Sequence, residues 1–176
     1  PLEIITDDQD FTQDWLREGQ VLGCVTTLKQ ALRGCKVVPL GAMEYVAVAS
    51  QGAIDHFCPG GLSAQSVIKM PFVAFNRKDD LPVEFISRAF RLKHVRLNQC
   101  FVPSSEGQVR AVLAGWGASV VPELLVRPFV ASGQLKLLAP KSALDINLYW
   151  HCWNLDSAAL NALSAAVISA AEQALK

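Results

Sequence analysis

Residues 97–113, LNQCFVPSSEGQVRAVL, join an apolar, strand-like run to a helix through a short polar turn. The run 97–102 reads as a strand, and Ser105 with Gln108 fits the capping box that begins many helices. The helix that follows has apolar residues at i, i+3, i+4 and i+7, which predicts one buried stripe formed by Val109, Val112, Leu113 and Trp116. A strand that leads directly into an amphipathic helix is the building unit of α/β folds.

The same alternation continues in both directions along the chain. We expect strands at residues 2–6, 21–27, 35–40, 45–49, 71–75, 97–102, 118–121, 135–138 and 146–153. We expect further helices at residues 8–18, 80–90, 123–131 and 157–176, with Asp8 and Asp156 as N-caps and Gly19 ending the first one. Residues 51–70 are Gly-rich and look irregular. Strand, helix and strand at this spacing predict right-handed crossovers and a parallel sheet.

Length and composition favour a folded, two-lobed protein. The chain has 176 residues, of which 51% are hydrophobic and 18% charged, so it can bury a sizeable core. Two βα blocks joined by long strands suggest two lobes, and in open α/β sheets a ligand binds beyond the carboxyl ends of the strands. We therefore expect a ligand cleft between the lobes.

Charge, cysteines and hydropathy exclude several classes. Sixteen Lys and Arg balance sixteen Asp and Glu, which argues against a nucleic-acid-binding surface in this chain. The five cysteines form no Cys-x-x-Cys pair, so we expect reduced thiols in a cytoplasmic protein. No uninterrupted apolar stretch is long enough to span a membrane, and the N-terminus does not look like a signal peptide.

The segment Ser104-Ser105-Glu106 is the strongest candidate for a binding site. It follows a strand and opens a helix, where free backbone N–H groups and the helix dipole favour an anion such as a carboxylate. The alternative is that the two serines only cap the helix, which is what serine commonly does at such positions.

Two further pairs of polar residues stand at the ends of expected strands. Asp79 and Asp80 follow the strand at 71–75 and could hold a cationic group, although Asp80 could equally be an N-cap. Thr26 and Thr27 end the strand at 21–27 and could face a ligand, although strand propensity alone explains threonine there.

Catalytic interpretations find little support. His151 and Cys152 are adjacent on an expected strand and therefore point to opposite faces, which makes a Cys–His nucleophile pair improbable there, and His56 near Cys58 is no stronger. The sequence has no nucleotide-binding glycine loop, no nucleophile elbow and no His-Glu-x-x-His zinc motif. We predict no cofactor, no metal ligand and no enzymatic activity.

With these residues in view, the chain resembles the effector-binding domain of a LysR-type transcriptional regulator, closest to the ArgP/LysG branch that activates exporters of basic amino acids. The resemblance runs in order along nearly the whole chain, through the segments 16–23, 30–35, 40–45, 73–75 with 79–80, 104–106 and 148–151.

The resemblance implies a periplasmic-binding-protein-like fold of two Rossmann-like lobes. Lobe I would comprise residues 1–48 plus 154–176, and lobe II residues 49–153. It also implies a winged helix-turn-helix DNA-binding domain that is not in this chain, and an effector domain that begins one strand and one helix before Pro1. Family members form homodimers or homotetramers and can act with RNA polymerase. We expect self-association through the edge of lobe I and the helix that starts at Ser105.

Our leading hypothesis is therefore a sensory domain that binds lysine or arginine and controls transcription. The α-carboxylate of the ligand would bind at Ser104 and Ser105. Its cationic side chain would bind near a carboxylate, with Asp79, Asp80 and Glu106 as candidates. The competing hypothesis is a solute-binding protein or a small hydrolase with the same two-lobe architecture, since the fold alone does not fix the function.

Overall fold

The computed structural model describes residues 2–176, which divide into two compact units. Unit 1 comprises the chain up to Met43 together with Asp145–Lys176, and unit 2 is the continuous segment Glu44–Leu144. The fold is a mixed α/β fold with an open sheet. Within residues 2–176, no helix combines the length and the hydropathy needed to cross a membrane.

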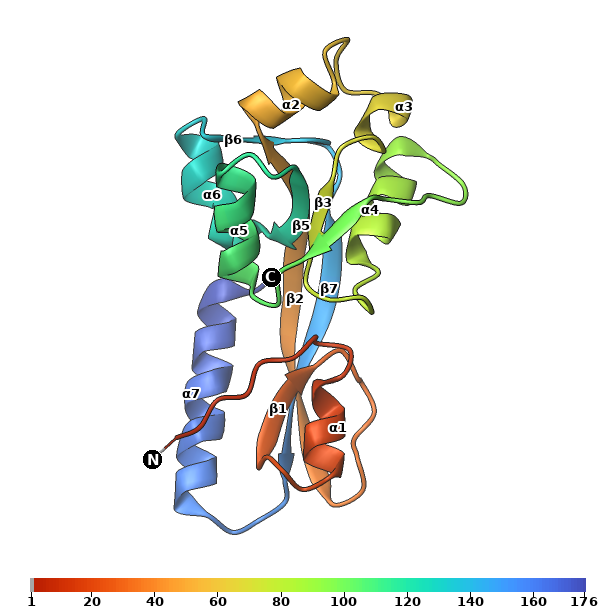
Figure 1. Ribbon diagram of the computed structural model, residues 1–176. Helices are drawn as coiled ribbons and strands as arrows, with labels where there is room; N and C mark the ends of the chain where they lie inside the picture. The colour runs from red at the N-terminus through yellow and green to blue at the C-terminus, as the bar shows by residue number, and fades with distance from the viewer. Residues whose placement is uncertain (1) are drawn as a thin grey trace. The chain divides into compact units, whose positions relative to one another are not determined.

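Helices and strands alternate along most of the chain (Figure 1). The helices are α1 (Thr12–Arg17), α2 (Gln51–Phe57), α3 (Ala64–Val67), α4 (Leu81–Phe90), α5 (Ser105–Leu113), α6 (Glu123–Ala131) and α7 (Ala158–Ala174). The strands are β1 (Gly23–Thr26), β2 (Cys35–Ser50), β3 (Phe72–Ala74), β4 (Gln99–Phe101), β5 (Ala118–Pro122), β6 (Leu135–Leu137) and β7 (Leu144–Trp153).

In unit 1 the strand order is β1-β7-β2, with α1 and α7 on opposite faces (Figure 1). β1 and β7 are antiparallel, and Cys24 lies opposite His151. On the α7 face, Trp150, Cys152 and Leu160 form a buried cluster against which Val25 packs. The expected parallel pairing is therefore wrong in this unit, because the neighbours of β1 and β2 come from a distant part of the chain rather than from the next βα step.

In unit 2 the strands lie in the order β6-β2-β5-β3-β4. β3 is parallel to both β4 and β5, as the βα alternation predicts, whereas β2 is antiparallel to both β5 and β6. Helices α5 and α6 cover one face of this sheet and α4 lies on the other (Figure 1). The core under α5 and α6 is built from valines of both helices and of the sheet, among them Val46, Val73, Val112 and Val126.

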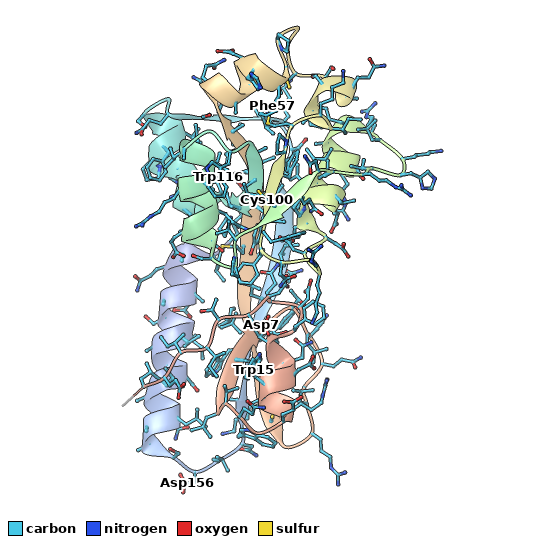
Figure 2. All side chains as sticks on the ribbon, viewed as in Figure 1. Asp7, Trp15, Phe57, Cys100, Trp116 and Asp156 are labelled. Atoms are coloured by element: carbon cyan, nitrogen blue, oxygen red, sulfur yellow. The ribbon has the colours of Figure 1, made fainter. Side chains whose placement is uncertain are left out.

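The N-terminal segment differs from the prediction. Residues 2–6 form no strand, and Ile4 is 79% exposed, because an apolar run becomes a strand only where another strand pairs with it. The first helix begins at Thr12 rather than at residue 8, since the Asp8 carbonyl accepts the Thr12 N–H at 3.1 Å and closes a turn before the helix. Asp7 instead accepts the indole N–H of Trp15 at 2.8 Å (Figure 2). Gly19 ends the helical turn with φ +73°, as predicted.

Two further predictions are corrected between residues 35 and 70. The strands expected at 35–40 and 45–49 are one continuous strand, β2, because Gly41 passes through it with φ +123°. A Cβ at Gly41 would lie 2.7 Å from the Lys176 carbonyl oxygen, so this close approach requires glycine. The region expected to be irregular contains α2 and α3, whose N-caps are Ser50 and Ser63.

Helix caps are displaced by one residue from their predicted positions. Ser104, not Ser105, caps α5, and Ser157, not Asp156, caps α7. In both helices the hydroxyl of the residue just before the first helical turn accepts the N–H three residues later, as N-cap serines do. The predicted stripe of α5 is buried at Val109 and Val112, but Trp116 lies beyond the end of the helix and is 57% exposed.

The buried Cys24 thiol makes the free energy of unfolding depend on pH in the alkaline range. Burial raises the pKa of the Cys24 thiol from 9.0 to about 11. The unfolded thiol therefore loses its proton above about pH 9 while the folded thiol keeps it, so the contribution of this group to stability is lost as the pH rises from 9 to 11. We expect the free energy of unfolding to fall less steeply over this interval in Cys24→Ala than in wild type, as measured by urea denaturation at each pH. Parallel pH profiles for the two proteins would contradict this expectation.

Candidate functional site

Two loops of unit 2 lie side by side at the carboxyl ends of β3 and β4. These strands are parallel with Ala74 opposite Phe101, and the Val102 N–H donates to the Ala74 carbonyl at 2.9 Å. The loop after β3 carries Asp79 and Asp80, and the loop after β4 leads to Ser104. Asp79, Asp80 and Ser104 therefore stand at the same edge of the sheet, the edge at which α/β proteins bind ligands.

Ser104 and Ser105 have different surroundings. The Ser104 hydroxyl accepts the Gly107 N–H at 3.1 Å and lies 3.4 Å from a carboxylate oxygen of Glu106. Ser105 is the first residue of α5 and makes no capping bond. Within the described chain, the N–H groups of Ser105 and Glu106 have no acceptor, so they are available to an anion at this helix end.

Gln108 adds a buried donor one turn further along α5. Its side chain is 3% exposed, and within residues 2–176 its Nε2 has no hydrogen-bond partner. A buried polar group of this kind is costly unless water or a ligand satisfies it. The sequence suggested Gln108 only as part of a capping box.

The two aspartates also differ. The Asp79 carboxylate accepts the Phe75 N–H at 2.9 Å and the Leu81 N–H at 3.1 Å, so it holds the loop in its conformation. Asp80 occupies the N-cap position of α4, is exposed, and makes no capping bond with its side chain. Asp80 is thus the N-cap residue of α4, as the alternative expected, but its carboxylate caps no N–H group and remains accessible to a cation.

Arg77 belongs to the same edge, although the sequence did not single it out. It lies in the loop after β3, and its guanidinium carbon stands 4.9 Å from the centroid of the Phe101 ring. This cation–π contact holds the positive charge of Arg77 against the end of β4, beside the candidate site.

The remaining predicted residues, Thr26 and Thr27, are in unit 1. Thr26 is fully buried, and its hydroxyl lies 2.6 Å from Gln13 Oε1 and 3.0 Å from the Gln9 carbonyl. The Thr27 hydroxyl donates to Asp10. Both hydroxyls therefore hold the turn before α1 against the end of β1.

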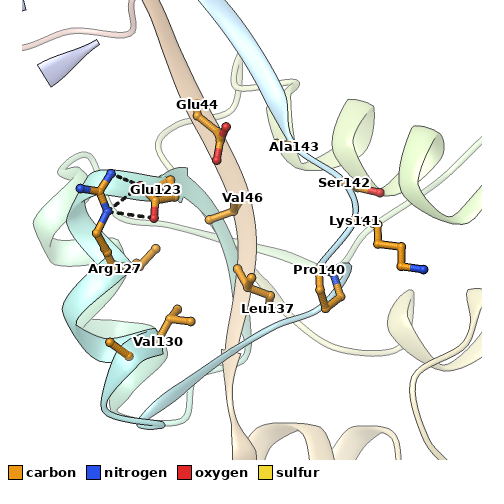
Figure 3. A pocket seen from close by; sticks show the side chains of 12 residues that line it. Glu44, Val46, Glu123, Arg127, Val130, Leu137, Pro140, Lys141, Ser142 and Ala143 are labelled. Atoms are coloured by element: carbon orange, nitrogen blue, oxygen red, sulfur yellow. Dashed lines mark hydrogen bonds and ion pairs between the residues drawn. The ribbon is translucent and has the colours of Figure 1, made fainter. Parts of the chain in front are cut away.

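A hollow of about 520 Å³ opens in unit 2 between α6, β2 and the segment after β6 (Figure 3). Its apolar floor includes Val46, Val126 and Leu137. Its charged lining consists of Glu44, Lys141 and the hydrogen-bonded pair Glu123 and Arg127, in which Arg127 Nη2 lies 2.7 Å from Glu123 Oε2. Hydrogen bonding by Glu123 raises the pKa of the Arg127 guanidinium, which therefore keeps its positive charge. The lining comes from separate parts of the chain, which is why no sequence motif indicated it.

The histidines and cysteines form no nucleophile pair at β7. His151 Nε2 lies 2.6 Å from the Leu28 carbonyl, whereas Cys152 packs on the α7 side, 3.8 Å from the Ser164 hydroxyl. The two side chains thus occupy opposite faces, as alternation along a strand requires. Among the described residues, no three His, Cys, Asp or Glu side chains gather in a group that could hold a metal ion.

Comparisons with known proteins agree with this architecture. The model of the LysR substrate binding domain matches residues 1–173. The chain is 37% identical over 170 residues to the HTH-type transcriptional regulator LysG of Mycobacterium tuberculosis, covering 97% of this chain and 55% of the relative. It is 37% identical over 175 residues to the HTH-type transcriptional regulator ArgP of Aeromonas salmonicida, covering 99% of this chain and 58% of the relative.

A solved structure extends the likeness to three dimensions. The full-length regulator LysG of Corynebacterium glutamicum with bound effector Arg superposes with a TM-score of 0.82 at 32% identity, covering 97% of this chain and 58% of that one. The chain thus spans little more than half of the length of each of these relatives. The family model, the two relatives and this fold together establish that the chain belongs to the LysR substrate-binding domain family and has its periplasmic-binding-protein-like, two-lobe fold.

Proposed function

We propose that this chain is the effector-sensing domain of a LysR-type transcriptional regulator and that its effector is a basic amino acid, lysine or arginine. The observation that carries the proposal is the likeness to LysG, whose structure holds the effector Arg, together with the charge pattern at the β3–β4 edge of unit 2. Units 1 and 2 would be lobes I and II of the family, and the regulated gene would encode an amino-acid exporter.

The chemistry of this edge suits both ends of a basic amino acid. An α-carboxylate would accept the first-turn N–H groups of α5 and the Ser105 hydroxyl, with the Arg77 guanidinium and the buried Gln108 amide as further donors. The cationic side chain would meet the exposed Asp80 carboxylate.

Other parts of the proposal follow from the family. A complete protein of this kind would carry a helix-turn-helix domain, assemble as a homodimer or homotetramer, act on RNA polymerase and work in the cytoplasm. Effector binding would regulate transcription through different affinities for two states of the protein. A solute-binding or hydrolytic role has no specific observation in its favour, since the relatives are named as transcriptional regulators.

Ser105→Ala is expected to weaken binding of lysine or arginine about tenfold or somewhat more without lowering stability. The hydroxyl makes no capping bond, whereas a hydrogen bond to a carboxylate contributes about 1.5–3 kcal/mol. Ser104→Ala is the matched control, because it removes the cap and should cost about 1 kcal/mol of stability. Isothermal titration of the complete gene product measures the affinities, and thermal unfolding the stabilities. Unchanged affinity in Ser105→Ala would remove the Ser105 hydroxyl from the proposed carboxylate site.

Asp80→Asn is expected to weaken binding of arginine by at least about tenfold while leaving binding of citrulline, its neutral analogue, within about twofold. The reason is that only the charged ligand loses an ion pair, and charge-assisted hydrogen bonds contribute roughly 1.5–3 kcal/mol. Asp55→Asn, at an exposed aspartate of α2, is the control and should change neither affinity. Equal losses for arginine and citrulline would remove Asp80 from the cation site, and no binding of any basic amino acid to wild type would refute the proposed effector class.

A further inference from the structure

The loop between α4 and β4 concentrates positive charge in a chain whose net charge is zero. Arg88, Arg91, Lys93, His94 and Arg96 fall within nine residues, and all five side chains are exposed. Arg88 is neutralised by Glu84, with 2.7 Å between Arg88 Nη2 and Glu84 Oε1. Within residues 2–176, Arg91, Lys93 and Arg96 make no ion pair. We call Arg91–Arg96 the basic loop; it projects from unit 2 between α4 and β4 (Figure 1).

Helix capping does not account for these charges. The chain leaves α4 through a Schellman motif, in which the Leu92 N–H donates to the Ser87 carbonyl at 3.0 Å and the Arg91 N–H to the Arg88 carbonyl at 3.4 Å. Arg91 therefore adopts φ +54°, at the position where glycine or asparagine is preferred. His94 also has a positive φ, +56°. Lys93 and Arg96 lie beyond the helix end, so the helix dipole does not explain them either.

The surface of the basic loop is positively charged and has no apolar centre. Large hydrophobic side chains are exposed at several places in the described chain, but none of them lies between residues 88 and 98. Protein interfaces depend on buried aromatic and aliphatic anchors at their centre, whereas contacts with a nucleic-acid backbone depend on cations and phosphates.

The dimensions fit one strand of a duplex. The five residue steps from Arg91 to Arg96 span at most about 17 Å, and over that length one DNA strand carries one phosphate per roughly 3.4 Å of helix axis. The three exposed cations Arg91, Lys93 and Arg96 can each contact a separate phosphate within this length. Because the relatives are HTH-type transcriptional regulators, a DNA duplex belongs to the assemblies in which such a domain works.

We propose that Arg91, Lys93 and Arg96 contact the phosphate backbone of DNA and add sequence-independent affinity to operator binding. The proposal rests on family membership and not on the identity of the effector. The proposal revises the earlier expectation that the chain has no nucleic-acid-binding surface. That expectation was based on the net charge of the whole chain, which conceals the local excess of cations in the basic loop. The proposal assigns no sequence recognition to the loop, since phosphate contacts position a protein without reading bases.

The test is the salt dependence of DNA binding by the complete gene product, measured by fluorescence anisotropy with operator DNA and with a random duplex. The variant is Arg91→Gly with Lys93→Gln and Arg96→Gln, in which glycine suits the positive φ and preserves the fold. The control variant, Lys29→Gln with Lys69→Gln and Lys136→Gln, removes the same charge from scattered exposed positions.

We expect the slope of log K against log salt to become shallower by about 2 to 3 in the loop variant, since each lost phosphate contact contributes about 0.9. Affinity at low salt should fall at least about tenfold, and by the same factor on both duplexes. The control should keep the wild-type slope to within about 0.5. An unchanged slope in the loop variant, an equal change in the control, or a loss confined to the operator would each overturn the proposal.

Discussion

Replacing Gly117 with alanine is expected to destabilise unit 2 by at least about 3 kcal/mol. Gly117 precedes β5 with φ +140°, a conformation that residues with a side chain rarely adopt. A Cβ there would clash with the Pro71 carbonyl oxygen, far inside van der Waals contact. That oxygen accepts the Ala118 N–H at 2.9 Å, so it cannot move aside without breaking the hydrogen bond that starts the strand.

Urea denaturation of Gly117→Ala measures this loss. Gly60→Ala is the matched control, because no atom lies within 4 Å of a Cβ at Gly60, and its free energy of unfolding should stay within about 1 kcal/mol of wild type. If Gly117→Ala were as stable as the control, the approach of Pro71 to the start of β5 would have to be looser than described.

Trp150→Ala is expected to lower the stability of unit 1 by about 3–5 kcal/mol. The Trp150 side chain is 5% exposed and packs with Cys152 and Leu160 between β7 and α7. Its indole N–H also donates to the Ser164 hydroxyl of α7 at 2.9 Å. Truncation therefore removes a large buried surface and leaves a cavity at the point where α7 is attached to the sheet.

Hydrogen exchange separates this local effect from a global one. Amides of α7 should lose protection most strongly in Trp150→Ala, and Trp150→Phe should keep part of it because most of the ring volume remains. The control is Trp116→Ala, which truncates the same residue type at a position that is 57% exposed, and its effect should stay below about 1 kcal/mol. Comparable losses at Trp150 and Trp116 would contradict the assignment of Trp150 to the core.

Local sequence patterns predicted the bounds of the helices and strands of unit 2 well, but predicted less well which strands pair with one another. The helices α4 and α6 and the strands β3, β5 and β6 appear close to their expected bounds, because their apolar periodicity and flanking turn residues are local signals. The antiparallel pairing of β2 with β5 depends on contacts between residues at least 69 positions apart, which no βα alternation reveals. Gly41 looked like a break between two strands, and only the nearby Lys176 carbonyl explains why glycine continues a strand there.

The candidate site shows the same division between local and distant information. Placing Ser104 and Asp80 at one edge needed only the rule that parallel strands share their carboxyl edge. Finding that Asp79 holds its own loop while Asp80 stays accessible required the hydrogen bonds. The stacking of Arg77 on Phe101 brings the loop after β3 against β4, and no local pattern in the sequence indicates the conformation of that loop.

The position of unit 2 in the chain has a consequence for how the molecule is made. Unit 2 is one uninterrupted segment, and Glu44 and Ala143, at or next to its two ends, line the same hollow. On the ribosome unit 2 emerges before Asp145–Lys176 does, so it can begin to fold while β1 still lacks its partner β7. Once folded, unit 2 no longer counts as a long flexible loop that β1 and β7 must close, which reduces the entropic cost of their late pairing. Unit 1 therefore begins before unit 2 in the chain but completes its fold after it, because β7 and α7 are the last elements to be synthesised.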